Sequence, residues 1–510
     1  MLPAPSHPDA ARLAALIRPG MREHLEHELL PRYLSARRWY AAKDAGPPDV
    51  RIVQAETFAH PRGAALLALV RVVPPGQPPQ IYFVPLALSS EAPHDERSLV
   101  GALSIEGESR HLIDALADDA SVRALVAAMR DGVPRGAVRF MRTRAFPEGI
   151  DLAEGTIARP HAEQSNSSVI VAGAMLKAFR RVQPGVHPEI EMTRHLTERT
   201  EFRRFARLLG AVELSAPDGA PTVVCALQAL IPNRGDGWTV AVNALERIAR
   251  GETRPAQTQL IALAARLGAR TAELHVALAA ASDDPAFAPE PITAADRRQW
   301  REAVAARARS ALAGVRQAQP RLMRGAAALA NRLCTLAPEI DDRIAALADT
   351  PLDAVRTRVH GDYHLGQVLV GGSDVYVIDF EGEPMRPLAE RRAKQCVLRD
   401  VAGMLRSFSY AAAAALYRDR GGSEGGATRL DAATAAMSQA FLAIYADAMR
   451  GCPSFPPAPQ ARRVLELFLL EKALYEIDYE IANRPDWVAI PLAGVLTLLR
   501  GTPADGEGSA

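Results

Sequence analysis

The segment that most constrains this chain is VHGDYHLGQVLVGGSDVYVIDFEGEP, which runs from Val359 to Pro384. It holds two short apolar runs typical of β-strands, and the GGSD sequence between them predicts a tight turn. The resulting hairpin brings the loop 360–367 beside Asp379. Asp362, Gln367 and Asp379 can then converge on one point, so any fold of this chain must gather several polar groups there.

The spacing within this segment is typical of phosphoryl transfer. Protein kinases use H-R-D-x-x-x-x-N followed by a strand ending in D-F-G, where the first Asp orients the hydroxyl and the Asn and second Asp hold Mg²⁺. Asp362 and Gln367 have the same separation of five residues, and D-F-E replaces D-F-G. Gln keeps the amide oxygen as a ligand. Gly361 replaces the Arg that reads a phosphorylated activation loop in many protein kinases, which favours a small-molecule kinase.

Other interpretations of the segment remain open from the residues alone. Strand periodicity puts Asp379 and Glu381 on one face of a mostly buried strand, where they suit Mg²⁺ or simply mark a strand end that emerges into water. His360, Asp362 and His364 alternate and could share a hydrolytic metal, although the groups downstream are mainly carboxylates. A structural histidine that caps the turn is the better hypothesis for His360.

A kinase also needs a Lys on an N-terminal strand and a Glu on a following helix to orient the nucleotide phosphates. AMLKAFRR supplies Lys177 on a predicted strand. HPEIEMTRHL supplies Glu189 and Glu191 on a helix that should begin near Val186, because Pro188 suits the first helical turn. These groups precede the catalytic loop in the order that the chemistry requires.

The remaining nucleotide contacts are expected on either side of Lys177. No Gly-rich loop precedes it, and EQSNSSV stands in that place. Backbone N–H groups and serine hydroxyls of this stretch can cover phosphates, the candidates being Ser165, Ser167 and Ser168. The strand in CALQALIPNRGDGW leads into a connector against which an adenine would lie, with Gln228 and Leu230 as the candidates.

Composition narrows the class of partner. The 60 Lys and Arg residues are balanced by 59 Asp and Glu residues, which leaves no positive excess to attract nucleic acid or an acidic membrane. The four cysteines are far apart and form no CxxC pair, so no disulfide framework or zinc knuckle is indicated. No segment supplies about 18 uncharged apolar residues. We therefore expect a cytoplasmic protein that acts on a small neutral molecule.

A chain of 510 residues is too long for one hydrophobic core, so several domains are expected. A short helix over 21–40 and the strand-like stretches VRIVQAETF, AALLALVRVV and QIYFVPLAL predict a module that ends near EAPHDERS. A further helix is predicted from Arg110, and SSVIVAGAMLKAFRR predicts two strands around an Ala-Gly turn. Beyond Asn233 the chain is mostly helical. The predicted domains are residues 1–105, 106–230 and 231–510.

The chain resembles the maltokinases, bacterial members of the aminoglycoside-phosphotransferase-like kinases, in motifs that span nearly its whole length. These are RRWYAAK, EQSNSSV, LKAFRRVQPGVHPEIEMTRHLTE, IPNRGDGW, ARTAELHVALA, HGDYHLGQVL, IDFEGEPMRPLAERRAKQCVLRDVAGMLRSFSYA and YEIDYEIANRPDWVAIPL. The resemblance implies an α+β, bilobal protein-kinase-like fold with a small β-rich N-lobe, a mostly helical C-lobe and an N-terminal cap. It also implies ATP and Mg²⁺ as cofactors, and phosphorylation of maltose to maltose 1-phosphate, which feeds glycogen synthesis from trehalose. A trehalose synthase partner is compatible with it.

Carried over residue by residue, the resemblance implies roles for the residues singled out above. Asp362 is the catalytic base, Gln367 and Asp379 are Mg²⁺ ligands, and Lys177 binds the phosphates with Glu191 as its partner. Glu381 either ligates the metal or braces Arg386.

Sugar recognition needs polar side chains around a flat apolar surface. One stripe of a predicted C-terminal helix and the aromatic residue after it supply Lys472, Glu476, Tyr479, Glu480 and Trp487. An upstream helix adds Arg392, Asp400 and Arg406. The alternative is an ion-paired helix that packs on the core, with Trp487 as a plug.

Other functions are distinguished by their demands on the site. A kinase of glucosamine or another small sugar shares every ATP-side residue, and an aminoglycoside kinase needs a more acidic pocket. A noncatalytic pseudokinase typically lacks Lys177, Asp362 or Asp379, and none of these is missing.

Overall fold

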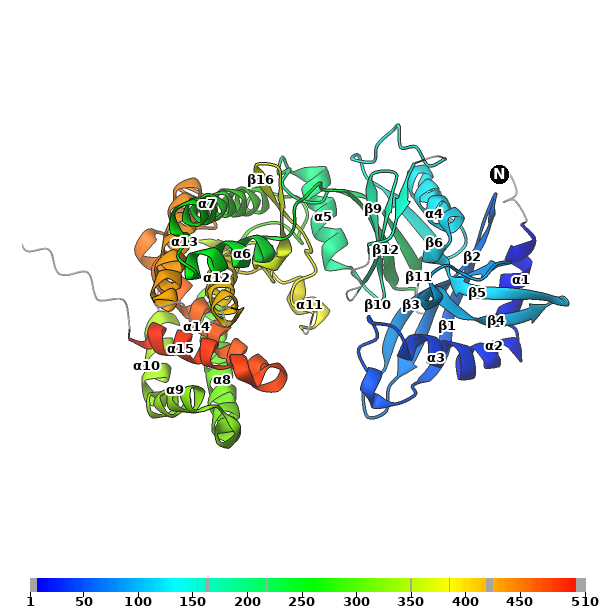
Figure 1. Ribbon diagram of the computed structural model, residues 1–510. Coiled ribbons are helices and arrows are strands. Elements are labelled where there is room, and N and C mark those ends of the chain that lie inside the picture. The colour runs from blue at the N-terminus through cyan, green and yellow to red at the C-terminus, as the bar shows by residue number, and fades with distance from the viewer. Residues whose placement is uncertain are drawn as a thin grey trace, which may run out of the picture. The chain divides into compact units, whose positions relative to one another are not determined.

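The computed structural model describes residues 7–153, 155–160, 166–215, 219–348, 351–384, 386–418 and 425–500. The chain divides into two compact units, Met1–Leu230 and Ile231–Ala510. This division coincides with the predicted start of the helical C-lobe at residue 231. Strands dominate the N-terminal unit and helices dominate the C-terminal unit, as the α+β prediction requires (Figure 1).

The first sheet of the N-terminal unit has the order β1-β2-β3-β5-β4, with β10 beside β3. Its strands are β1 (Asp49–His60), β2 (Gly63–Val73), β3 (Gln80–Ser89), β4 (Leu99–Ile105), β5 (Glu108–Asp114) and β10 (Arg181–Val182). The three predicted strands are therefore confirmed. The limit predicted after residue 105 falls inside the β4–β5 hairpin, and the sheet continues through it.

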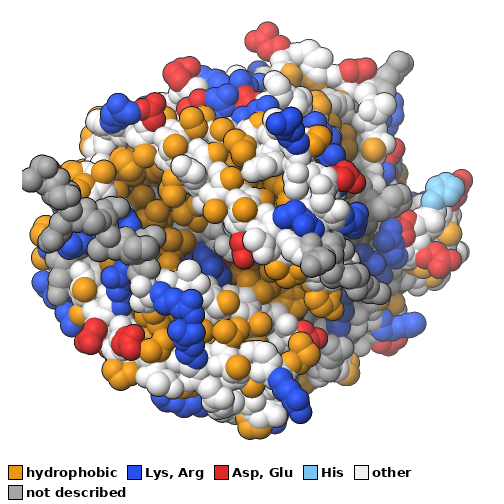
Figure 2. Space-filling model, turned by 60° about the vertical axis from the view of Figure 1, so that its left-hand side comes forward, with side chains coloured by type: hydrophobic (Ala, Val, Ile, Leu, Met, Phe, Trp, Pro, Cys, Tyr) orange, Lys and Arg blue, Asp and Glu red, His pale blue; other side chains and the backbone are white. Residues whose placement is uncertain are grey.

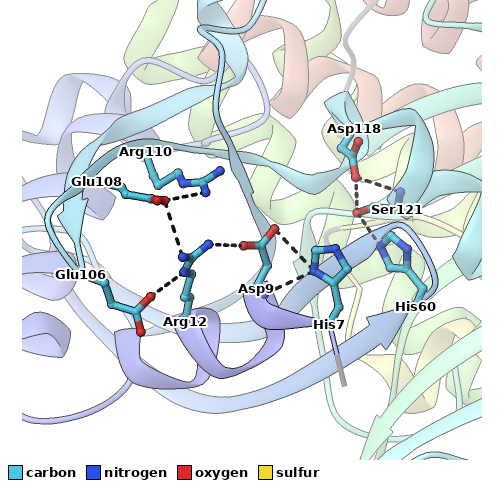
Figure 3. Close-up of polar contacts among 9 residues, drawn as sticks. All are labelled: His7, Asp9, Arg12, His60, Glu106, Glu108, Arg110, Asp118 and Ser121. Atoms are coloured by element: carbon cyan, nitrogen blue, oxygen red, sulfur yellow. Dashed lines mark hydrogen bonds and ion pairs between the residues drawn. The ribbon is translucent and has the colours of Figure 1, made fainter. Parts of the chain in front are cut away.

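Short helices cover one face of this sheet. They are α1 (Pro8–Leu16), α2 (Met21–His24), η1 (Leu25–Leu29), α3 (Leu30–Ser35) and the single turns η2 (Lys43–Ala45) and η3 (Glu96–Ser98). Arg12 on α1 pairs with Glu106 at 2.9 Å, beside the Arg110–Glu108 pair at 2.7 Å (Figure 3). Exposed pairs of this kind contribute about 0–1 kcal/mol, so α1 is held mainly by its buried leucines.

A second sheet of the same unit has the order β6-β11-β12-β9-β8-β7. Its strands are β6 (Val138–Arg142), β7 (Ile157–Ala158), β8 (Asn166–Val171), β9 (Ala174–Phe179), β11 (Leu208–Ser215) and β12 (Pro221–Ala229). The predicted Ala-Gly turn joins β8 to β9, and both Ala172 and Gly173 have positive φ. η4 (Ala115–Ala117), α4 (Asp119–Asp131) and α5 (Pro188–Arg199) complete the unit, and α5 begins within two residues of the predicted start near Val186.

The helix predicted from Arg110 is wrong in its first half, because residues 108–114 form β5. The two faces of the first sheet pack on different hydrophobic cores, and on β5 Leu112 belongs to one core while Ile113 belongs to the other. A strand buried on both faces loses the alternation that identifies a strand in a sequence. The helix starts at Asp119 instead, capped by the carboxylate of Asp118 (Figure 3).

The C-terminal unit is a helical assembly with two short two-stranded sheets, β13-β14 and the β15-β16 hairpin. Its long helices are α6 (Gly237–Ala249), α7 (Thr253–Leu278), α8 (Ala294–Ala318), α9 (Arg324–Thr335), α10 (Ala337–Ala348), α12 (Leu398–Arg418), α13 (Gly426–Ala448), α14 (Ala458–Asn483) and α15 (Ala489–Leu499). The short elements are β13 (Glu290–Pro291), η5 (Gln319–Arg321), β14 (Val355–Arg356), η6 (Leu365–Gln367), β15 (Val368–Gly371), β16 (Asp374–Val377), α11 (Leu388–Arg391) and η7 (Pro485–Trp487).

Helix hydropathy and surface charge both bear on the prediction that the protein binds neither membranes nor nucleic acids. Among the described residues, none of the helices combines the length and apolar character that a membrane span requires. Figure 2 shows Lys and Arg side chains scattered over the face in view, with hydrophobic and neutral surface between them. This distribution agrees with the balance of 60 basic and 59 acidic residues in the chain.

Candidate active site

The opening segment forms the hairpin that its sequence predicts. β15 and β16 pair antiparallel, with Val368 opposite Val377. The Ile378 N–H donates to the carbonyl oxygen of Gln367 at 3.0 Å, which extends the pairing by one step. The Gln367 side chain then donates from Nε2 to Oδ2 of Asp379 at 3.1 Å. The predicted convergence of Gln367 and Asp379 is thus confirmed.

The end of this hairpin departs from strand geometry. β16 stops at Val377, and Asp379 has φ 66°, in the left-handed region that non-glycine residues seldom adopt. The predicted alternation of faces therefore ends two residues before Asp379. Phe380 is buried and packs against the ring of His360 at 5.0 Å between centroids. A strained carboxylate braced by its neighbours is typical of a functional position.

His360 has the structural role that was predicted for it. It is buried, its Nε2 lies 2.9 Å from the carbonyl oxygen of Ile378, and its Nδ1 accepts the N–H of Asp362 at 3.3 Å. Both ring nitrogens are therefore engaged in holding the loop 360–362 against the hairpin. His360 is not placed to bind a metal, so the hydrolytic metal site is not supported. His364 lies with Nε2 3.9 Å from Oδ2 of Asp362.

Asp400 holds the same loop through its carboxylate and also lines the cavity that contains Asp362, so its role in sugar binding stays a prediction. Its two oxygens accept the N–H groups of His360 at 2.8 Å and Gly361 at 2.9 Å, and the side chain is 2% exposed. His275 on α7 lies 3.2 Å from the same carboxylate and 2.8 Å from the hydroxyl of Tyr445. Burial alone raises the pKa of Asp400, but the hydrogen bond and charge of His275 hold it below its usual value.

Asp362 lines a cavity within the C-terminal unit. One side of this cavity is a stripe of α14 in which Phe468, Glu471, Lys472 and Tyr475 follow the i, i+3, i+4, i+7 spacing of one helical face. The facing side comes from the segment after the hairpin and from α11, and includes Glu383, Arg386, Glu390 and Arg391. Of these eight residues, the sequence analysis assigned only Lys472 to the sugar site.

Most charges around the cavity are paired. Lys472 Nζ donates to Glu383 Oε1 at 2.8 Å, and Arg386 Nε donates to the other oxygen at 2.5 Å. Arg399 pairs with Glu471 at 2.6 Å. Glu383 therefore pairs with Arg386, which was one of the two roles that the sequence analysis left open for Glu381. Burial alone raises the pKa of Glu383, but Lys472 and Arg386 together lower it to about 2.

This shift predicts a pH-dependent contribution to stability. The Glu383 contribution is fully present above its unfolded pKa, near 4.5, and is lost as pH falls toward about 2. We expect Glu383→Gln to lower the free energy of unfolding by about 3 kcal/mol at pH 7, and by less below pH 4.5. Urea denaturation at several pH values measures this difference. Glu246→Gln, in a pair with Arg418 at 3.2 Å, is the control with an expected change of about 0–1 kcal/mol. A pH-independent difference would contradict the assignment.

Several predicted sugar-site residues instead form ion pairs with one another or with a neighbour, as the alternative interpretation proposed. Arg406 on α12 donates twice to Glu476 on α14, at 2.6 and 2.9 Å, and both are buried. Glu480, also buried, accepts from Arg484 at 2.7 Å. Glu476 and Glu480 lie on α14, next to the helical face that lines the cavity. Of the residues predicted on this helix for the sugar site, only Lys472 belongs to that face. Three further predicted residues are absent from the cavity lining: Arg392, Tyr479 and Trp487.

The N-terminal unit contains the predicted lysine with a carboxylate partner. Lys177 on β9 pairs with Glu189 on α5 at 2.7 Å, and Glu189 is 1% exposed. The amide of Gln228 donates to the second oxygen of Glu189 at 2.8 Å. The ion pair assigned to Glu191 is therefore made by Glu189, because the two positions lie about 200° apart around a helix. Leu230, half-buried, follows the end of β12.

The pairing of β8 with β9 shows on which face of the sheet each predicted serine lies. Ser168 lies directly opposite Lys177, so their side chains share one face of the sheet. Ser167 points to the other face, where its hydroxyl accepts from Arg180 Nε at 2.8 Å. This places Ser167 on the face opposite Lys177, and its contact with a phosphate stays a prediction. Ser165 lies outside the described residues. Lys177, Ser168, Gln228 and Leu230 also remain predicted nucleotide contacts.

The donor set at the hairpin fits a magnesium ion. Oxygen ligands from one or two carboxylates are what Mg²⁺ takes from proteins that bind it with a nucleotide. One oxygen of Asp379 lies within 4.8 Å of one oxygen of Glu381, and Gln367 touches Asp379. The carboxamide of Gln367 presents its oxygen after a simple flip of the amide. These three side chains could hold the ion.

Comparison with known proteins places this site in a family. The family model described as "Phosphotransferase enzyme family" matches residues 156–429, and "Maltokinase N-terminal cap domain" matches residues 33–118. A glucosamine kinase of Streptacidiphilus jiangxiensis is 30% identical over 340 residues, covering 66% of this chain and 72% of that protein. A glucosamine kinase of Mycolicibacterium smegmatis is 31% identical over 349 residues, covering 66% of this chain and 78% of that one.

Solved structures show the same fold. A glucosamine kinase in complex with glucosamine, ADP and inorganic phosphate matches with a TM-score of 0.65 and 24% identity, over 92% of this chain and 99% of that chain. A second crystal form of a glucosamine kinase matches with a TM-score of 0.67 and 24% identity, over 94% and 100% of the two chains. The predicted kinase-like fold is thus confirmed. The chain belongs to the phosphotransferase enzyme family and carries the N-terminal cap domain of the maltokinase type.

Proposed function

We propose that this protein is a sugar kinase that transfers the γ-phosphoryl group of ATP to the anomeric hydroxyl of maltose, giving maltose 1-phosphate and ADP. The observation that carries the proposal is the position of Asp362. It lies on a loop that His360 and Asp400 hold by its backbone, and it lines a cavity rich in hydrogen-bonding groups. An acceptor hydroxyl in this cavity can therefore be met by a positioned carboxylate.

Each of the proposed site residues has a different role in phosphoryl transfer. Asp362 orients the acceptor hydroxyl and accepts its proton, a modest task because an anomeric hydroxyl is unusually acidic for an alcohol. Lys177, held by Glu189, is the cation that we assign to the phosphates of ATP. Bound Mg²⁺ supplies charge neutralisation on the transferred phosphoryl group, and Gln367, Asp379 and Glu381 are the side chains to hold it.

The charges in the cavity favour a neutral acceptor. Glu383 is neutralised by Lys472 and Arg386, and Glu471 by Arg399. These carboxylates already have cationic partners, so an ammonium group of a substrate would have to compete for them. Tyr475 and Phe468 provide apolar surface for a sugar ring. Maltose meets both conditions, as do other neutral sugars.

Glucosamine is the second candidate acceptor. The similar proteins named above are glucosamine kinases, and one solved structure contains glucosamine. Glu390 on the cavity wall lies 3.8 Å from Arg386, a loose pair that leaves a carboxylate able to meet one ammonium group. An aminoglycoside with several ammonium groups fits this charge pattern less well. The trehalose synthase partner remains a prediction.

An acceptor panel tests the proposal. Phosphate transfer from labelled ATP in the presence of Mg²⁺ is measured with maltose, glucose, glucosamine and kanamycin, one at a time. We expect kcat/KM to be highest for maltose, and we expect the product to lose its reducing end because the phosphate blocks the anomeric carbon. Activity on glucosamine alone would replace the acceptor and leave the mechanism standing. Transfer to none of these sugars would contradict the proposed function.

A further inference from the structure

A second cavity lies in the N-terminal unit, and of the described residues predicted to contact the nucleotide only Ser167 and Ser168 line it. It has a volume of about 250 Å³. Its walls come from the end of α3 and the RRWYAAK segment, from the end of β5, and from β8 with the residues after β9. The residues that matter at its base are Tyr33, Arg37, Trp39, Asp114 and Arg180. The proposed reaction uses none of them.

Arg180 is the most constrained cation of this cavity. It is 3% exposed, and it donates from Nη2 to Asp114 at 2.6 Å and from Nε to Ser167 at 2.8 Å. Its guanidinium lies over the ring of Trp39, 5.0 Å from the centroid. Nη1 is buried and has no hydrogen-bond partner in the described part of the chain. Stacking uses the face of the guanidinium, so it leaves the in-plane N–H groups of Nη1 unsatisfied.

Asp114 cannot balance a further cation. The Oδ2 atom that accepts from Arg180 also accepts the hydroxyl of Tyr33 at 2.7 Å. The Oδ1 atom accepts the N–H of Leu116 at 3.0 Å. Both carboxylate oxygens are therefore engaged, and the single negative charge of Asp114 is offset by Arg180.

Arg37 adds a second buried positive charge. It is 8% exposed, and its hydrogen bonds within the described ranges go to the main-chain carbonyl oxygens of Tyr33 and Arg97 rather than to a carboxylate. The rim arginines differ, because Arg97 pairs with Asp95 and Arg159 pairs with Asp119. The base of the cavity thus holds two buried guanidiniums with one buried carboxylate, Asp114. The exposed Asp95 on the rim is shared between Arg97 and the charge of Arg37. An unbalanced buried charge is costly unless an anion accompanies it.

We propose that this cavity binds a phosphate group, either as inorganic phosphate or as the phosphate of a small sugar ester. Arg37 and Arg180 supply the charged donors, and the planar guanidinium of arginine can donate to two oxygens of one phosphate at once. The hydroxyl of Ser98 also lines the cavity, and Trp39 forms a flat wall on which a sugar ring can lie. A purely structural role explains the Arg180–Asp114 pair and the position of Arg37 over the ring of Tyr33, 4.7 Å from its centroid, but it leaves the buried Nη1 donor of Arg180 without a function.

This proposal stands independently of the proposed reaction. The cavity contains neither Lys177 nor Asp362, and its Trp39 belongs to the RRWYAAK motif, which the catalytic assignment leaves without a role. A phosphate site here gives that motif a function in the cap domain whichever sugar is the acceptor.

The test is a binding titration with the full chain at constant ionic strength. Inorganic phosphate, glucose 1-phosphate and acetate are titrated by calorimetry into the wild-type protein and into three variants: Arg37→Gln, Arg110→Gln and Lys177→Gln. We expect phosphate to bind, acetate to bind more weakly, and Arg37→Gln to weaken phosphate binding at least tenfold. Arg110→Gln is the matched control, because Arg110 lies on the same sheet and pairs with Glu108 outside the cavity.

The outcomes separate this site from the catalytic one. Tighter binding of glucose 1-phosphate than of inorganic phosphate identifies a sugar ester as the ligand, and equal binding identifies the free ion. Loss of binding in Lys177→Gln but not in Arg37→Gln would place the phosphate at the nucleotide site and overturn the proposal. If Arg37→Gln does not fold, tryptophan fluorescence of the wild-type protein tests whether phosphate binds in this cavity. Phosphate must then change the wild-type emission, and Trp39→Phe must abolish that change; no change in the wild type refutes the site.

Discussion

Replacing Asp362 by Asn is expected to lower turnover by about 10²- to 10⁴-fold while leaving the affinity for ATP unchanged. Asn keeps the size and the hydrogen-bonding ability of the side chain but cannot accept the proton of the acceptor hydroxyl. The loop should keep its shape, because Asp400 and His360 hold it through backbone N–H groups. Steady-state kinetics with the preferred acceptor, together with nucleotide binding by calorimetry, measures both quantities.

The matched control for this substitution is Asp431→Asn, the same chemical change at an exposed position on α13. It should leave turnover and ATP affinity as they are in the wild type. If Asp362→Asn turns over at a near-normal rate, Asp362 is not the base. A loss of thermal stability in Asp362→Asn alone would instead point to a structural cause.

Replacing Asp379 by Asn is expected to lower kcat/KM for ATP by about 10³-fold and to raise the Mg²⁺ concentration needed for half-maximal activity. The substitution removes the charge of a proposed metal ligand with little effect on the backbone. Asp379 has φ 66°, and Asn is one of the few residues that tolerate this region as well as Asp. The measurement is the rate as a function of Mg²⁺ concentration at saturating acceptor.

Asp374→Asn serves as the control in the same hairpin. Asp374 pairs with Arg270 on α7 at 2.8 Å, so its loss should reduce stability without changing the Mg²⁺ dependence. Identical Mg²⁺ dependence in Asp379→Asn and the wild type would remove Asp379 from the metal site. The two variants together separate loss of a metal ligand from loss of an ion pair.

Local sequence was sufficient to predict the hairpin, the positions of Asp362, Gln367 and Asp379 around it, and the strand that carries Lys177. Each of these depends on a short stretch of chain. A glycine-rich turn between two apolar runs allows few conformations, and the five-residue separation of Asp362 and Gln367 is a property of the loop itself. The start of α5 at Pro188 is equally local, because proline lacks the N–H group that the first turn does not need.

Contacts between distant segments decided the other features. The period of a helix shows that α14 has a polar stripe, but it does not show which of two neighbouring stripes faces the cavity; packing against α12 buried Glu476 and left Lys472 and Tyr475 on the cavity wall. The sequence offered Asp400 as a sugar-site candidate, and only the tertiary structure showed that its carboxylate accepts backbone N–H groups of the loop 360–362.

The C-terminal boundary of the cap domain also depended on contacts between distant segments. The sequence by itself determined the strands of the first sheet, the catalytic spacing and the helical character of the C-terminal unit. Only the tertiary structure decided that β5 is a strand, that the first sheet continues past residue 105 and that Glu189 is the partner of Lys177. The physical reason is that burial on both faces of a sheet, and the choice between carboxylates on one helix, depend on partners far away in the chain.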